Sequence, residues 1–349
     1  TPFLLNTMAA AYQGASAASL RLPPSDDPLK ARRTHLFDAF VQKRLYSDTP
    51  RYAPAQTRQY LAWLAGRLVQ FGQSAFYIES LQPGWLSSRN ARIRYRISLL
   101  ISIVFFTLFI AASWVFISDT IFSLVAEQRL RSLDQIAYFA TNMMLCTLPF
   151  ALILGMAAFF RKAIFMAENV KFAITWSSLL VSVVFGLLGA LVASIDSSES
   201  NSNPIIGFVV IGAAFLLITS WRLSENVTMR VQPNQGIRET TRNAVVGMFG
   251  AGLAIVIAIA ITFPNVIEFA VFFGANLGLI IGFAGFGGFS VVQHIVLRTI
   301  LFLARRIPWN YARFLDYSAS AGLLRKVGGG YLFAHRYLLE YFAERDGQA

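Results

Sequence analysis

Few residues in this sequence are suited to acid–base, nucleophilic or metal chemistry, and they are scattered. There are three histidines, His35, His294 and His335, and one cysteine, Cys146, which lies inside an apolar segment. Three separated histidines without a cysteine pair are not the ligand set of a zinc site, and a single cysteine excludes a disulfide within the chain. His35 stands in a short basic run and is expected at the surface.

The glycine loop Gly-x-x-x-x-Gly-Lys-Ser/Thr, whose backbone N–H groups cradle nucleotide phosphates, does not occur in the sequence. The chain is therefore not expected to bind a triphosphate alone or to be an enzyme by itself. The remaining polar residues stand between or within strongly apolar segments, and these segments must position them.

The composition is typical of a membrane protein rather than of a soluble globule. Of 349 residues, 56% are hydrophobic and 14% are charged, and the mean hydropathy is +0.54. The net charge of +12 raises the question of nucleic acid. Most basic residues near the apolar segments, however, lie where the positive-inside rule places them. We therefore expect the lipid bilayer as a partner and do not expect nucleic acid.

Six apolar segments fill the block from about Ile97 to Leu303. Each is about long enough to cross a hydrocarbon core of about 30 Å at about 1.5 Å per residue. The segments lie at about 97–117, 137–160, 172–195, 204–221, 244–263 and 266–286. An even number of crossings puts the soluble pieces before and after the block on the same side.

The basic residues of the connections indicate which side that is. Basic residues precede the first crossing and follow the second and the fourth: Arg89, Arg92, Arg94, Arg96, Arg161, Lys162, Lys171, Arg222, Arg230, Arg238 and Arg242. The alternate connections hold Arg129 and Arg131 in the first, and no Lys or Arg in IDSSESNSNP or TFPNV. Because cytoplasmic connections carry the excess of Lys and Arg, both chain ends are expected in the cytoplasm.

The stretch that follows the sixth segment is ambiguous. Gly287 and Gly288 predict a break, and Gln293, His294 and Arg298 gather near the middle of an otherwise apolar helix at about 289–306. We interpret it as a final amphipathic helix that is interfacial or partly buried. A seventh crossing is the alternative.

The sixth segment carries Gly274, Gly278 and Gly282 at a spacing of four. Small residues at this spacing let two helices approach closely, either within the chain or in a homo-oligomer. Ionisable residues inside a crossing mark ion or substrate paths, but Glu268 stands at a segment end and the midplanes hold almost none. A pump or proton-coupled transporter is therefore not expected.

The soluble pieces on either side read as helical. A short helix is expected after Pro2, a loop from Gly14 to Asp27, and a further helix after Pro54. Apolar residues with helical spacing mark two amphipathic helices: Leu36, Phe37, Phe40 and Val41, then Leu61, Leu64, Ala65, Leu68 and Val69. In the last piece, a helix near Phe314, a turn at Gly328–Gly330, a short YLF strand and a helix from His335 form the closing half of a winged-helix-like unit.

The predicted fold class is thus an all-α polytopic membrane protein with about six transmembrane helices. A small cytoplasmic, α-rich, winged-helix-like domain is built from both chain ends, because neither soluble piece is large enough for a core of its own. The expected boundaries are 1–90 for the first piece, 91–306 for the transmembrane domain and 307–349 for the closing piece.

The soluble pieces resemble a known family. The stretch GLLRKVGGGYLFAHRYLLEYFA resembles the closing part of the winged-helix domain of NACHT-type signalling ATPases of the STAND class, with its Phe-x-His pattern at Phe333 and His335 and its Glu-aromatic-Phe-Ala ending at residues 340–343. TPFLLNTMAAAY resembles the segment after the NACHT ATPase core, and LFDAFVQKRL with residues 56–86 resembles the helices that follow it in bacterial members. The matches cover about 1–87 and 308–345.

The resemblance implies a nucleotide site shared with a missing upstream domain. Pro2 would contact the adenine and His335 the β-phosphate of bound ADP, while the upstream NACHT ATPase core would hold most of the ADP or ATP. The alternative is that His335 is only a hydrogen-bonded core histidine and Pro2 only a helix start. In soluble members the two matching pieces are nearly contiguous, so here the membrane block is expected to be inserted into the winged-helix domain.

The leading hypothesis is therefore a C-terminal fragment of a bacterial NACHT-type STAND ATPase in the plasma membrane. In this hypothesis the chain senses the nucleotide state for signalling and performs no catalysis. Two alternatives stay open at this point: an oligomeric channel or pore gated by its cytoplasmic domain, and a membrane-tethered protein-binding module.

Overall fold

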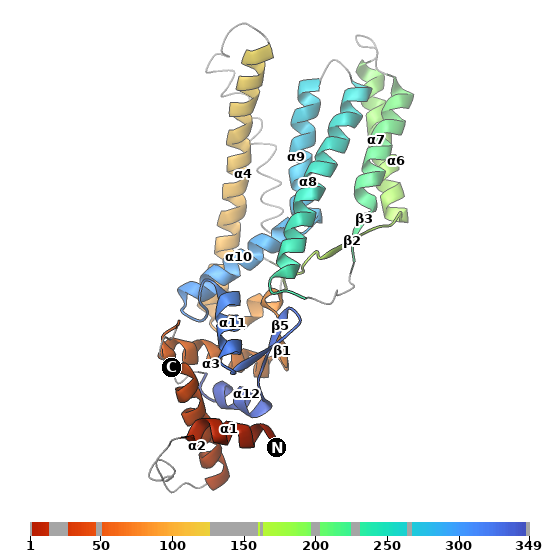
Figure 1. Ribbon diagram of the computed structural model, residues 1–349. Coiled ribbons are helices and arrows are strands. Elements are labelled where there is room, and N and C mark those ends of the chain that lie inside the picture. The colour runs from red at the N-terminus through yellow and green to blue at the C-terminus, as the bar shows by residue number, and fades with distance from the viewer. Residues whose placement is uncertain are drawn as a thin grey trace. The chain divides into compact units, whose positions relative to one another are not determined.

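A computed structural model of the chain (Figure 1) describes residues 2–13, 27–46, 51–125, 160, 163–196, 203–224, 231–263 and 267–346. These residues are mostly helical. The chain divides into two compact units, the first comprising Thr1–Leu81, Met229–Gln235 and Arg298–Ala349, and the second Gln82–Thr228 and Gly236–Leu297. The first unit thus contains both ends of the chain.

The first unit begins with three helices that each start at a proline. These are α1 (Pro2–Tyr12), α2 (Pro28–Leu45) and α3 (Pro54–Gln70). Proline is favoured in the first turn because its missing N–H would have had no helical partner. Before α2, the carboxylate of Asp27 accepts a hydrogen bond from the backbone N–H of Lys30 at 3.0 Å. Helices α1 and α3 start where the sequence predicts them, and α2 starts directly after the predicted end of the loop at Asp27. The loop itself lies almost entirely outside the described residues.

Segments from both ends of the chain form one antiparallel sheet in this unit. Its strands are β1 (Ala75–Phe76), β4 (Leu324–Val327) and β5 (Gly330–Phe333), in the order β1-β5-β4. Phe76 lies opposite Tyr331 in the register. The sequence predicts only the β5 strand, so β1 and β4 correct the expectation of an all-α fold: this unit combines helices with a small sheet.

Two further helices flank the β4–β5 hairpin. They are α11 (Tyr311–Ser320) and α12 (Arg336–Ala343), and a short 3-10 turn, η2 (Ile78–Ser80), follows β1. The predicted glycine turn is confirmed, with Gly328 at a φ of +56° that glycine adopts without strain. Large buried side chains come from α2, α3, η2, α11, α12 and the sheet: Phe37, Val41, Leu61, Leu64, Phe76, Ile78, Tyr311, Phe314, Tyr331, Leu338 and Phe342.

The second unit is dominated by long apolar helices. After η3 (Pro83–Trp85), its elements are α4 (Arg89–Val125), β2 (Asn169–Phe172), α6 (Trp176–Asp196), α7 (Pro204–Ser220), β3 (Trp221–Ser224), α8 (Gln235–Thr262), α9 (Ile267–Gly285) and α10 (Gly288–Leu303). The helices occupy the predicted apolar segments, except for the one at 137–160, which lies outside the described residues apart from Phe160.

Two of these helices are long and apolar enough to cross a membrane, at Trp176–Ser194 and Gln235–Thr262. Gly274–Gly285 and Gly288–Leu303 form a pair bent by 60° that counts as a third if it is one broken span, and α7 is a shorter apolar helix. Within the described residues the structure therefore contains two or three candidate spans, consistent with insertion into a membrane. Six crossings remain a prediction.

The glycine stripe of α9 packs against α8 within the chain. A β-carbon on Gly278 would lie 2.6 Å from the Cα of Gly252, and one on Gly274 would lie 2.8 Å from the carbonyl oxygen of the same residue. Gly282 likewise lies against Ala244 and Met248. Of the two readings of the stripe, the structure thus supports helix packing inside one chain. Ile255, Ile259 and other apolar residues of α7, α8 and α9 fill the neighbouring core.

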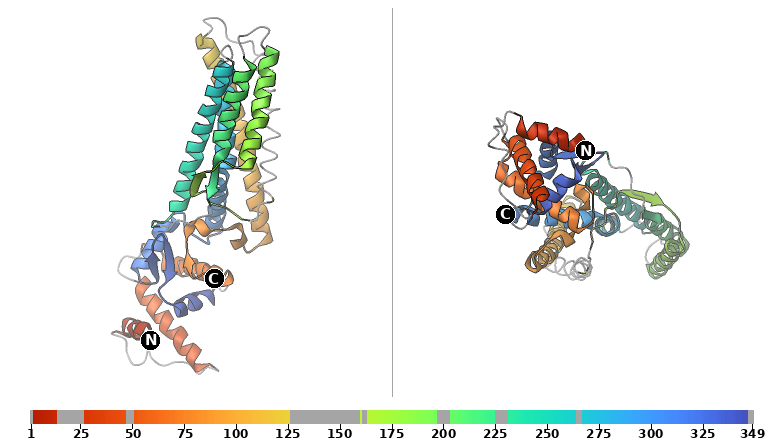
Figure 2. Two further views of the ribbon diagram at one scale, coloured as in Figure 1. Left: turned by 90° about the vertical axis from the view of Figure 1, so that its right-hand side faces the viewer. Right: turned by 90° about the horizontal axis from the view of Figure 1, so that it is seen from below.

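The hairpin of α6 and α7 is closed in the same way (Figure 2). A β-carbon on Gly189 would lie 2.8 Å from the carbonyl oxygen of Gly207, and the reverse distance is also 2.8 Å. Beside this crossing, the rings of Phe185 and Phe215 stack with centroids 3.8 Å apart. Side chains at the two glycines would force the backbones apart, so the close crossing depends on their absence.

Helix α10 has its polar side turned inward. Ser290, Gln293 and His294 are 3%, 0% and 1% exposed, whereas Ile295 is 53% and Leu303 71% exposed. The predicted break at Gly287 and the helix after it are confirmed. Unlike a surface helix in water, however, α10 buries its polar side chains and exposes apolar ones. Such an arrangement is what a lipid-facing outer surface requires if α9 and α10 form one broken span.

Packing of α9 on α8 leads to a stability prediction. Gly278→Ala places a methyl group on the α8 backbone and should lower the free energy of unfolding by about 1–3 kcal/mol. The measurement is thermal unfolding of the full chain in detergent. Gly250→Ala, in α8 with nothing near the added β-carbon, is the matched control and should unfold at the wild-type temperature or slightly above it, since alanine favours helix. Equal effects of the two substitutions would contradict the packing.

Candidate functional site

His335 caps the start of α12. Its backbone is extended, with φ −154° and ψ 153°, and its Nδ1 accepts a hydrogen bond from the backbone N–H of Tyr337 at 3.2 Å. One of the N–H groups that a helix start leaves without a helical partner is thereby satisfied. An imidazole whose Nδ1 accepts a hydrogen bond carries its proton on Nε2 when neutral. The side chain is half-buried.

Tyr337 connects His335 with a basic residue of α2. The ring of Tyr337 lies 5.0 Å from that of His335, centroid to centroid, and the guanidinium carbon of Arg33 lies 4.1 Å from the Tyr337 centroid. A guanidinium at this distance is attracted by the negative face of the ring. The structure therefore brings together two nitrogen-rich groups, from α2 and α12, around one aromatic ring.

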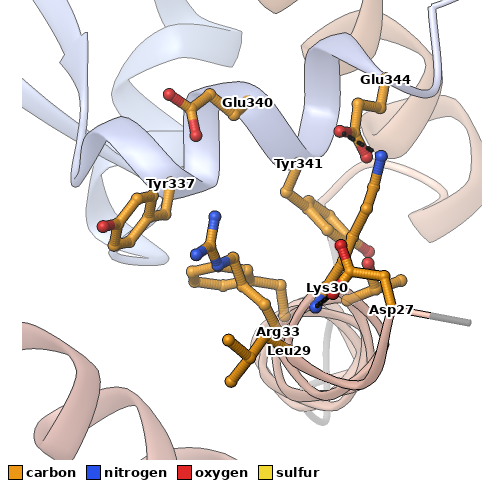
Figure 3. A pocket seen from close by; sticks show the side chains of 10 residues that line it. Asp27, Leu29, Lys30, Arg33, Tyr337, Glu340, Tyr341 and Glu344 are labelled. Carbon is orange, nitrogen blue, oxygen red and sulfur yellow. Dashed lines mark hydrogen bonds and ion pairs between the residues drawn. The ribbon is translucent and has the colours of Figure 1, made fainter.

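Arg33 and Tyr337 also line a pocket of about 320 Å³ between α2 and α12. Figure 3 shows Arg33 reaching from α2 toward Tyr337. Of the acidic residues on the pocket wall, Glu344 is paired with Lys30 at 3.0 Å and Glu340 with Arg336 at 2.9 Å. Among the described residues, the guanidinium of Arg33 contacts an aromatic ring and no carboxylate. Asp27 also lies on the wall, where its carboxylate accepts from the backbone N–H of Lys30 at 3.0 Å. The pocket lining thus carries three carboxylates and two cations, and Arg33 is the cation that is not paired with a carboxylate among the described residues.

A charged network behind the pocket holds α12 in place. The Tyr341 hydroxyl donates to Asp38 of α2, and both carboxylate oxygens of Asp38 accept from Nη2 of Arg345, at 3.2 and 3.0 Å. Arg345 also lies over the Tyr341 ring, 3.8 Å from its centroid. Further along, Arg67 of α3 pairs with Asp346 at 2.9 Å. The position of His335 is therefore fixed from the far end of its helix as well.

Burial and acidic neighbours raise the pKa of two tyrosines in this unit. Burial raises the pKa of Tyr341 first, and its hydrogen bond to Asp38 raises it further because ionisation would place two negative charges together. Burial likewise raises the pKa of Tyr331, whose hydroxyl donates to Asp316 at 2.9 Å. Both phenols remain protonated well above neutral pH.

Pro2, the second predicted site residue, is the first residue of α1. Helix α1 is tied to α2 through Tyr12, whose hydroxyl shares a 2.8 Å hydrogen bond with Nδ1 of His35 and whose ring stacks on that imidazole. His35 is therefore half-buried and structural, not a free surface residue as expected. His335 does not line the pocket, and the side chain of Pro2 lies outside the part of the chain that the structure describes.

Sequence reasoning missed Arg33 and Tyr337. The signal available for Arg33 was its place in a basic run at the start of α2, and for Tyr337 its place two residues after the capping histidine. Neither signal shows that the two side chains meet. Among the described residues no group of three His, Cys, Asp or Glu side chains is placed to hold a metal ion.

Comparison of the chain with protein-family models, with curated proteins and with solved structures finds no match. Function therefore has to be inferred from the chemistry of the site and from the sequence resemblance.

The raised pKa values of Tyr331 and Tyr341 predict a loss of stability in alkali. Phenols in the unfolded chain ionise near pH 10, whereas the folded phenols keep their protons to higher pH. Their contribution is fully present below about pH 10 and falls as the pH rises above it. The measurement is the free energy of unfolding of the full chain in detergent, from denaturant titrations between about pH 8 and pH 11.

The control is the Tyr331→Phe, Tyr341→Phe double variant, which has no phenol at either position. It should be less stable than the wild type at pH 8, but its stability should fall less steeply above pH 10. Parallel curves for the two proteins would show that these phenols do not cause the alkaline loss.

Proposed function

We propose that this chain is the membrane-anchored regulatory part of a NACHT-type STAND signalling ATPase, with ADP or ATP bound mainly by an upstream core of the same protein. In this proposal His335 contacts the β-phosphate and the chain itself has no ATPase activity. The observation that carries the proposal is the pairing of β1 with β5, because it builds one unit from the chain before and after the apolar block.

The topology of that unit supports a winged-helix-like assignment. Helix α11 leads into the β4–β5 hairpin, and the strand that precedes the apolar block completes the sheet in the order β1-β5-β4. This is the arrangement expected of a winged helix in which the connection after the first strand has been replaced by the membrane segments. Such a winged helix can keep its fold because β1, the strand before the insertion, still pairs with β5 of the hairpin.

The chemistry of the site supports a phosphate contact. With Nδ1 engaged by the helix start, the proton of His335 lies on Nε2, which is the atom able to donate to a phosphate oxygen. Arg33 adds a permanent positive charge on the other side of Tyr337. Exchange of ADP for ATP in the upstream core would change what His335 meets and so shift α12 relative to its resting position.

His335→Asn separates the capping role from the ligand role. Asparagine is a favoured capping residue, so the variant should keep the stability of α12 while losing the Nε2 donor. A hydrogen bond to a charged group contributes about 1.5–3 kcal/mol, so the ADP dissociation constant of the full-length protein should rise about 10- to 100-fold. Isothermal titration with ADP is the measurement, with thermal unfolding to check the fold.

His335→Ala is the matched comparison, since it removes both the cap and the donor and should lower stability as well as ADP affinity. If His335→Asn binds ADP with wild-type affinity, the histidine is a helix cap only. That result would favour a membrane-tethered binding module without a link to nucleotide.

The proposal also places both chain ends in the cytoplasm of a bacterium. Single cysteines at Ser74 and Ser320, both exposed in the first unit, should then react with an impermeant maleimide only from the cytoplasmic side, in a Cys146→Ser background. A cysteine at Ser198, in the connection that lacks basic residues, should react only from outside. Labelling of Ser320→Cys from outside would show that the crossing number is odd and that His335 is out of reach of cytoplasmic nucleotide.

A further inference from the structure

One side of the first turns of α4 carries three arginines. Helix α4 is a single long helix that begins at Arg89 (Figure 1). We call Arg89, Arg92 and Arg96, whose side chains are all exposed, the arginine group. Their spacings of three and four make them neighbours on the helix surface. Three positive charges therefore gather on the same side of α4.

An exposed apolar row continues from the arginine group along α4. Its members follow Arg89 at a spacing of four and are 44%, 48%, 62% and 70% exposed: Ile93, Ile97, Ile101 and Phe105. Ile93 comes four positions after Arg89 and three before Arg96, so the row and the arginine group are neighbours on one surface. Contiguous exposed apolar surface marks a contact with a membrane or a partner.

The opposite side of the same turns packs into the second unit. Buried side chains recur there at a spacing of four: Ala91, Tyr95, Leu99 and Ile103. Ile103 clusters with Phe289 of α10, and the hydroxyl of Ser88 accepts a hydrogen bond from the backbone N–H of Ala91 at 3.0 Å. The outward direction of the arginine group and the apolar row is thereby fixed, and a site organised before its ligand arrives loses little entropy on binding.

The arginine group has few acidic neighbours. The first turn of α4 contains no acidic residue, and within the described ranges no carboxylate is paired with Arg89 or Arg92. Like charges three and four positions apart on a helix destabilise it. A phosphate bound among these arginines would turn the repulsion into attraction, and the planar guanidinium fork suits two hydrogen bonds to phosphate oxygens.

The place of the arginine group along α4 matches the headgroup layer of a bilayer. The first predicted crossing begins at about Ile97, and at about 1.5 Å per residue Arg92 lies about 7 Å before it. The headgroup layer is about 5–7 Å thick on each side of the hydrocarbon. The apolar row is about 18 Å long from Ile93 to Phe105, close to the hydrocarbon depth of one leaflet, which is about 15 Å.

We propose that this side of α4 binds an anionic phospholipid of the leaflet at the helix start, with its phosphate at the arginine group and an acyl chain along the apolar row. A lipid fits better than a free anion because the positive and the exposed apolar side chains lie on the same side of one helix. A soluble anion would contact the arginines alone. The inference depends on α4 entering the membrane and is independent of the nucleotide proposal.

The test introduces a tryptophan into the apolar row of the full chain by Phe105→Trp. The protein is placed in phosphatidylcholine vesicles that contain phosphatidylglycerol with brominated acyl chains, because bromine quenches tryptophan on contact. Subtracting the fluorescence of the parent protein isolates the added signal. Half-maximal quenching of this signal should require a lower mole fraction of brominated phosphatidylglycerol than of brominated phosphatidylcholine. No quenching by either lipid would refute the proposal.

Removal of the arginines should remove the preference for the anionic lipid. The preference should fall about fivefold for each arginine lost, so Arg89→Gln with Arg92→Gln should abolish most of it. Arg92→Gln alone should show the single fivefold loss and remains informative if the double variant does not fold. An unchanged preference in these variants would overturn the proposal.

The matched control is Arg94→Gln with Arg238→Gln. Both arginines are exposed in the second unit, but Arg94 lies on another side of α4 and Arg238 near the start of α8. The control therefore removes the same charge and leaves the arginine group intact, and it should keep most of the preference. Equal losses in the two double variants would show a general attraction between surface charge and anionic lipid, and no site on α4.

Inorganic phosphate at constant ionic strength distinguishes a lipid from a free anion. If the arginine group binds a headgroup, added phosphate should leave the quenching by brominated phosphatidylglycerol unchanged. Displacement of the lipid by millimolar phosphate would show that the site takes a soluble anion and would refute the assignment to a lipid.

Discussion

The pairing of β1 with β5 is the constraint on which the first unit depends. The chain leaves this unit after β1 and returns to it only for α11 and the hairpin, so the sheet forms only if both ends meet. The pair is short, with two residues in β1, and its hydrogen bonds alone would stabilise it little. Its strength comes from side chains: Phe76 is fully buried and packs against Tyr311 with centroids 5.4 Å apart.

The second unit depends on close packing between helices, as the first depends on the pairing of β1 with β5. Because lipid chains are as apolar as leucine, burial of apolar surface does not drive helices together in a membrane, and contact between small residues does. The α6–α7 and α8–α9 pairs both rely on glycines that face a neighbouring backbone. The inward polar side of α10 is consistent with the same environment, since Gln293 and His294 would be costly against hydrocarbon.

The parts of the structure that could be predicted are those with a signal in their own local sequence. The starts of α1 and α3 follow from proline, the existence of α2 follows from its apolar spacing, and the break at Gly287 follows from its glycines, so the sequence alone predicts them. Strands β1 and β4 have no comparable local signal, because what makes them strands is pairing with β5. For the site, the sequence singles out His335, but the meeting of Arg33 with Tyr337 depends on how α2 and α12 pack, which no spacing encodes.

The glycine at the helix break packs against the segment that leads into β2. Gly287 has a φ of +90°, and a β-carbon there would lie 2.6 Å from the β-carbon of Ala167 and 2.7 Å from the Cγ2 of Thr240. Ala167 belongs to the segment that Asn243 holds by its carbonyl and that continues into β2. A side chain at position 287 would have to displace Ala167 or Thr240, and its backbone would also be strained at a positive φ. Because packed interiors have no room for an added group, the break before α10 and the path of the chain into β2 both depend on glycine at this one position.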